Sequence, residues 1–118
     1  MLYMLLIYAN EAAMPGPSDA ETYTMLPAYA AYAQAMTDAG VRVAGDRLRP
    51  TTAATTVRTV GGKTQVLDGP YAETKEQLGG YFLIDVPDLD AALAWAQRCP
   101  GAAVGAVEIR PIWPHAAA

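Results

Sequence analysis

Cysteine, histidine and basic side chains are all scarce in this chain of 118 residues. A single cysteine cannot form an internal disulfide, and together with a single histidine it cannot build a Cys/His metal cluster. Only eight Lys and Arg residues stand against twelve Asp and Glu residues, and the net charge is −4. This balance argues against a surface that binds phosphates. We therefore predict no metal ion, no cofactor and no direct contact with nucleic acid.

The N-terminus lacks the basic region that precedes the apolar part of a secretory signal. Its first nine residues are apolar, and this run is far shorter than the roughly 20 residues that span a bilayer. Its aromatic and branched side chains favour a buried strand instead. We expect a cytoplasmic protein without membrane contact, in which Cys99 stays reduced.

Hydrophobic residues make up 53% of the chain and charged residues only 17%, which excludes a disordered polyelectrolyte. This length suits one domain and makes two domains cramped. We predict a single domain over residues 1–113, followed by a flexible tail over 114–118.

Apolar patterns and turn residues divide the chain into regular elements. A Ser-x-x-Glu capping box at Ser18 and Glu21 predicts the start of a helix, and Gly40 ends it. Pro27 starts a second helical segment or bends a continuous one. Asp88 caps another helix, whose predicted buried stripe is Leu89, Ala92, Leu93, Ala96 and Cys99. Strands are expected over 2–8, 41–48, 81–86 and 106–112, and a hairpin over 55–67 turns at Gly61-Gly62.

The order strand, helix, strand, hairpin, strand, helix, strand predicts an α+β protein of the ferredoxin-like βαβ-βαβ type with an inserted β-hairpin. Segments 2–8 and 81–86 are apolar on both faces, so we place them at the centre of the sheet. Two crossover helices cover only one face of such a sheet. The other face then exposes an alternate set of large side chains, and we predict that a second copy covers it by sheet-to-sheet packing. The expected exposed set is Tyr3, Leu5, Ile7, Tyr81 and Leu83, or the residues that alternate with them.

The segment Asp68-Gly69-Pro70-Tyr71-Ala72-Glu73-Thr74-Lys75-Glu76-Gln77-Leu78-Gly79-Gly80-Tyr81 resembles the YCII-related family. It is similar to the branch named for an Asp-Gly-Pro-Phe motif (the DGPF branch), with Tyr71 in place of Phe. Residues 3–8, 83–92 and 107–111 resemble the same family. The resemblance implies a ferredoxin-like subunit that forms a dimeric α+β barrel through its sheet.

In the enzyme-like branch of that family, a histidine on the first helix and a nearby aspartate are the proposed active pair, and one such member is a dehydrochlorinase. Tyr29 stands at the matching helix position, and His115 lies in the tail, so this mechanism does not carry over. Some relatives are associated with regulators of the sigma-factor type. The resemblance therefore also implies a regulator protein as an alternative partner.

Two groups of residues are candidates for a pocket. The loop after the hairpin carries Asp68, Tyr71, Glu73 and Lys75, which form either a polar pocket wall or a solvated turn. Tyr29 and Asp46 either converge on a small ligand or are a core ring and an edge charge.

Arg58, on the predicted hairpin, either clamps a carboxylate or faces solvent. Our first hypothesis is a homodimer that binds a small cyclic or aromatic compound, with catalysis left open. As a cofactor-free enzyme of proton transfer or elimination, it would use Glu73 or Asp68 as base. Lys75 or Arg58 would then stabilise charge, and Tyr29 would orient the ligand. The alternative is a non-catalytic binding or regulatory module.

Overall fold

A computed structural model describes residues 1–13 and 26–114. Its strands are β1 (Leu2–Ala9), β2 (Arg42–Arg47), β3 (Thr55–Val60), β4 (Lys63–Asp68), β5 (Gln77–Asp85) and β6 (Ala106–Pro111). The helices are α1 (Leu26–Asp38) and α2 (Leu89–Arg98), with short 3-10 turns η1 (Glu11–Ala13), η2 (Thr51–Ala53) and η3 (Pro100–Ala103). The predicted capping box at Ser18 and Glu21 lies outside the described residues.

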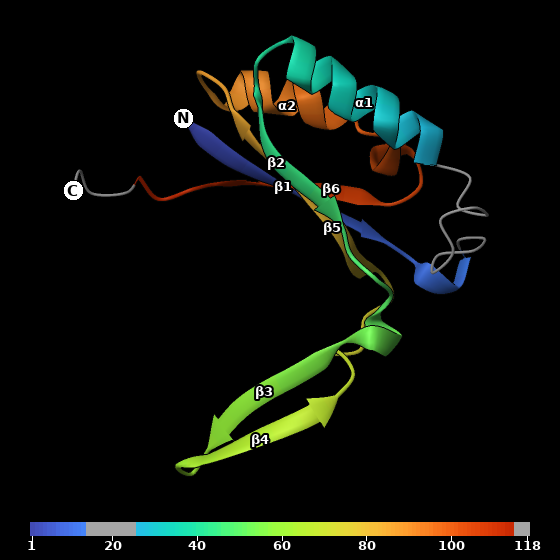
Figure 1. Cartoon of the computed structure of the whole chain (residues 1–118), viewed down its shortest axis with the longest axis vertical. Helices are drawn as coiled ribbons and strands as arrows, with labels where there is room; N and C mark the ends of the chain where they lie inside the picture. Colours follow the sequence, from blue (N-terminus) through green and yellow to red (C-terminus); the bar gives the residue numbers. More distant parts are fainter. Residues whose placement is uncertain (14–25, 115–118) are drawn as a thin grey trace.

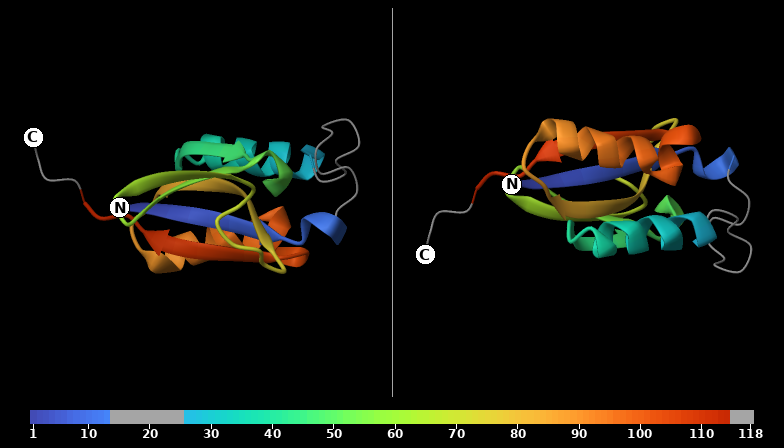
Figure 2. Two further views of the ribbon diagram at one scale, coloured as in Figure 1. Left: turned by 90° about the horizontal axis from the view of Figure 1, so that it is seen from below. Right: turned by 90° about the horizontal axis from the view of Figure 1, so that it is seen from above.

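Four strands form one antiparallel sheet in the order β2-β5-β1-β6. Together with α1 and α2 this order is the ferredoxin-like α+β fold, as predicted. The two strands that are apolar on both faces, β1 and β5, are the central pair. Both helices lie on one face of the sheet, α1 over the β2 edge and α2 over the β6 edge (Figures 1 and 2).

Strand register decides which side chains lie under the helices. Leu5 pairs with Phe82 and Tyr3 with Ile84, and all four are buried in the core. Leu6 pairs with Tyr81 and Met4 with Leu83, and these side chains are half-buried on the open face away from the helices. The set predicted from alternation therefore mixed two faces, because odd residues of β1 lie opposite even residues of β5.

The two helices contribute side chains of different sizes to the core. On α1, Tyr32 and Met36 are buried, and the Tyr32 hydroxyl donates to the carbonyl oxygen of Trp95 at 2.6 Å. On α2, Asp88 caps the helix as expected, accepting from the amide of Ala91 at 2.9 Å. Its buried stripe is made of small residues, Ala92, Ala96 and the following Cys99, whereas Leu89 and Leu93 are 55% and 45% exposed.

Strands β3 and β4 form a two-stranded sheet of their own. Gly61 and Gly62 take the two turn positions with φ of 58° and 79°, as the sequence predicted. Strand β5 begins at Gln77, four residues before the predicted start. Gly79 is an extra residue there, since Ile7 pairs with Gly80 and Tyr8 with Leu78.

Among the described residues, neither helix has the length and apolar character needed to cross a membrane.

Candidate functional site

A cavity of about 250 Å³ lies between α1, the β2 edge of the main sheet and the η3 turn. Its walls are mostly apolar. They include Ile7 and Phe82 from the central strands, Ala30 and Ala33 from α1, and Val104 after η3. The cavity is below the roughly 300–1,000 Å³ of pockets for drug-sized ligands, so it suits a smaller molecule.

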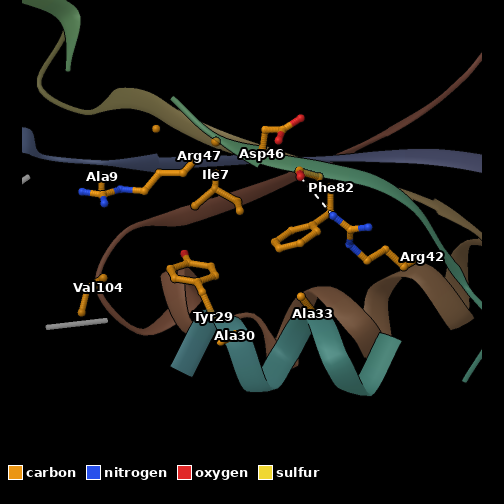
Figure 3. A pocket seen from close by; sticks show the side chains of 14 residues that line it. Ile7, Ala9, Tyr29, Ala30, Ala33, Arg42, Asp46, Arg47, Phe82 and Val104 are labelled. Atoms are coloured by element: carbon orange, nitrogen blue, oxygen red, sulfur yellow. Dashed lines mark hydrogen bonds between the residues drawn. The ribbon is translucent and has the colours of Figure 1, made fainter. Parts of the chain in front are cut away.

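Tyr29 and two glycines shape the inside of this cavity. The Tyr29 ring stacks on Phe82 with centroids 6.4 Å apart, and its hydroxyl points toward the sheet (Figure 3). A Cβ atom at Gly101 would lie 2.5 Å from this hydroxyl and 2.7 Å from Cγ2 of Ile7. A Cβ atom at Gly45 would overlap the Phe82 ring. Gly101 therefore lets the Tyr29 hydroxyl approach the backbone closely, and Gly45 makes room for the Phe82 ring.

Two arginines of β2 line the same cavity, although the sequence interpretation did not select them. Arg42 and Arg47 are five residues apart, and in a regular strand such residues face opposite sides. Here Val43 is an extra residue, since Arg42 pairs with Ile84 and Ala44 with Leu83. This bulge turns both guanidinium groups toward the helix side, where they reach opposite ends of the cavity (Figure 3). One nitrogen of Arg42 donates to the carbonyl oxygen of Gly45 at 3.1 Å.

The structure does not bring Tyr29 and Asp46 together. Asp46 pairs with Tyr81 and lies on the open face of the sheet, where the Tyr81 hydroxyl donates to its carboxylate at 2.9 Å. This hydrogen bond raises the pKa of Tyr81. Asp46 borders the cavity through its backbone, and its side chain points away from Tyr29 (Figure 3).

The candidates from the loop and the hairpin lie outside the cavity. Asp68, Glu73 and Lys75 are exposed, and none has a side-chain partner in the described parts of the chain. Arg58 lies over the ring of Tyr71, 4.9 Å from its centroid, and both side chains are exposed. Within residues 1–13 and 26–114, no three His, Cys, Asp or Glu side chains are arranged to hold a metal ion.

Cys99 lies just outside the cavity wall and is 3% exposed. Its sulfur is 4.0 Å from the Tyr29 hydroxyl. Burial raises the pKa of the Cys99 thiol, so it is protonated at neutral pH and is a poor nucleophile.

Raising the pH from about 7 to about 10 should lower the free energy of unfolding of the native sequence more than that of Cys99→Ala. The unfolded thiol ionises at its ordinary pKa, whereas the folded thiol keeps its proton to higher pH. The stability from this group is therefore complete below the ordinary thiol pKa and is lost as the pH rises through the raised one. Urea denaturation at several pH values measures this difference, and equal losses in the two proteins would contradict it.

The chain is therefore a ferredoxin-like α+β domain with a small apolar pocket under one edge strand. The family model of the YCII-related domain matches residues 1–116, and the chain belongs to this family. A protein of Rhizobium meliloti (strain 1021), described as uncharacterized, is 41% identical over 114 residues. The matched region covers 95% of this chain and 92% of that relative.

Proposed function

We propose that this YCII-related protein binds a small cyclic or aromatic molecule that carries an acidic group. The observation behind this proposal is the composition of the cavity. Apolar side chains form its walls, and Arg42, Arg47 and the Tyr29 hydroxyl supply its polar groups. A ring would fill the apolar space, and a carboxylate or phenolate would accept hydrogen bonds from a guanidinium group.

The distribution of charge supports an anionic ligand. The whole chain has a net charge of −4, yet the charged side chains that reach this cavity in the described residues are arginines. The acidic neighbour Asp46 faces the other side of the sheet. Two cations beside a low-dielectric wall attract an anion and disfavour a cationic ligand of the same size.

Binding is better supported than catalysis. General acid–base chemistry needs a titratable group within hydrogen-bond reach of the ligand. The bases suggested by the sequence, Asp68 and Glu73, lie on exposed segments outside the cavity. A proton-transfer or elimination activity, membership of the DGPF branch and a sigma-factor-type partner stay predictions of the resemblance.

We also propose that the protein is a homodimer through the open face of its sheet. Leu2, Met4, Leu6 and Leu83 lie on this face and remain partly exposed in the single chain. Full burial of a large apolar side chain is worth about 1.5–3 kcal/mol. A second copy packed sheet to sheet would supply that burial and leave both cavities on the outer, helix-covered sides.

A thermal-shift comparison of benzoate, cyclohexanecarboxylate, phenol and benzylamine tests the ligand proposal. We expect the two acids to stabilise the protein and the amine to have no effect. Ala33→Phe should abolish the stabilisation, because the new ring occupies the cavity beside Tyr29. Ala31→Phe is the matched control, since Ala31 is an exposed residue of the same helix that does not line the cavity.

The double variant Arg42→Gln with Arg47→Gln separates the charge from the shape of the site. It should weaken the binding of the two acids by about tenfold or more, which is the usual contribution of a charged hydrogen bond. The binding of phenol should be unchanged. Acids that bind Ala33→Phe as tightly as the native chain would place the ligand elsewhere and overturn the proposal.

A further inference from the structure

The β3–β4 hairpin is the part of the described chain that packs least. Of its strand residues, Thr56 is half-buried and all the others are exposed. Its apolar side chains are 51–64% exposed; they are Val57, Val60, Val66 and Leu67. In Figure 1 the hairpin stands off from the main sheet, on the side away from both helices. An isolated two-stranded hairpin is marginally stable in water, so this one needs a surface to pack on.

The base of the hairpin is tied to the body of the protein. The Gly69 amide donates to the Ala54 carbonyl at 2.7 Å, and the Thr56 hydroxyl donates to the Gly69 carbonyl at 2.8 Å. Thr51 lies just before the hairpin and donates two hydrogen bonds to Glu11. Its amide donates to one carboxylate oxygen at 2.8 Å, and its hydroxyl donates to the other at 2.7 Å. The first two contacts close the ends of the hairpin on each other, and the contacts between Thr51 and Glu11 connect the segment before it to η1.

We infer that the hairpin is an arm that packs against the second copy of this chain in the sheet-to-sheet dimer proposed above. The arm and the open sheet face lie on the same side of the molecule (Figure 1). A partner that covers the open face therefore also comes within reach of the arm. Because a two-fold dimer uses the same surfaces on both copies, each copy would give one arm and receive one.

Charge favours a second copy as the occupant. The arm carries two basic residues, Arg58 and Lys63, and one acidic residue, Asp68, so its net charge is positive. The open face carries Asp46 and two ion pairs, Glu108 with Arg110 and Asp85 with the N-terminal amine, so its net charge is negative. A second copy would therefore bring a basic arm beside an acidic sheet face.

The close ends of the hairpin allow a clean test. Residues 55–68 can be replaced by Asn-Gly, since Ala54 and Gly69 are already hydrogen-bonded. Sedimentation of the full chain across a dilution series should give a dimer at micromolar concentration. The shortened chain should dissociate at a concentration about 100-fold higher or more, while its circular dichroism and thermal unfolding show that the ferredoxin-like body still folds.

Two double variants keep the hairpin and change one of its faces at a time. Val57 and Val66 pair across one face, and Val60 and Leu67 lie on the other. Changing either pair to Thr keeps strand propensity and removes apolar contact. One of the two double variants should weaken dimer formation by about tenfold, and the other should have little effect on it. If the native chain is a dimer and neither the excision nor either double variant weakens it, the proposed role of the arm is overturned and the sheet-to-sheet dimer is not. If the native chain is a monomer, both proposals are overturned.

Discussion

Gly105→Ala should lower the free energy of unfolding by about 3 kcal/mol. Gly105 comes directly before β6, where the chain passes against the end of β1. An added Cβ atom would overlap the carbonyl oxygen of Tyr8 and lie 3.0 Å from its carbon and 3.1 Å from Cα of Ala9. These are backbone atoms of a central strand, so no side-chain rotation relieves the overlap, and β6 must shift away from β1.

Gly79→Ala is the matched control for this prediction. Gly79 also lies beside β1, but its added Cβ atom would be 3.9 Å from the carbonyl oxygen of Ile7, an ordinary contact. A Gly-to-Ala change without strain leaves stability unchanged or raises it by about 0.4–1 kcal/mol. Urea denaturation of both variants at one protein concentration measures the contrast. Equal stability of the two would contradict the close approach at Gly105.

Leu5→Ala should lower the free energy of unfolding by about 3 kcal/mol through a different cause, the loss of packing. Leu5 is fully buried at the centre of β1, between Phe82 on β5 and Ile109 on β6. Removing its side chain leaves a cavity among strands that cannot close together without breaking their register.

Leu93→Ala provides the comparison, because Leu93 is 45% exposed on α2. This substitution should lower the free energy of unfolding by less than about 1 kcal/mol, since much of the Leu93 side chain already contacts water. Both variants should be unfolded at the same protein concentration as the native chain, because the dimer proposed above would add to apparent stability by mass action. A loss at Leu93 as large as that at Leu5 would mean that α2 packs on another surface in solution.

The arrangement of the sheet could be predicted because β1 and β5 are apolar on both faces, and only central strands bury both faces. Which face of each central strand lies under the helices could not be predicted. Alternation separates Leu5 from Leu6, but the pairing of Leu5 with Phe82 depends on contacts far apart in the sequence. On α2, the predicted stripe was correct for Ala92, Ala96 and the following Cys99, which are buried, and wrong for Leu89 and Leu93, which are exposed. A stripe of small residues lets the helix approach the sheet closely and leaves its larger leucines outside.

Of the seven candidate pocket residues, Tyr29 reaches the cavity with its side chain and Asp46 only with its backbone. The sequence favoured Asp68, Glu73 and Lys75 because charged residues are concentrated in a glycine-containing segment. Local composition does not determine whether the side chains of such a segment face a cavity or solvent. The glycines at 45 and 101 were a usable signal, because glycine within or beside a strand often marks a close approach. Whether those residues bind a ligand stays a prediction.

The extra residue in β2 has a consequence for divergence within the family. Deleting one residue between Arg42 and Ala44 would reverse the side on which Arg42 lies, while Arg47 kept its place. One guanidinium would then leave the cavity and join the surface proposed for the partner, with no change in amino-acid composition elsewhere. A relative whose strand is one residue shorter at this point would therefore be expected to lose half of the positive charge of the proposed anion site.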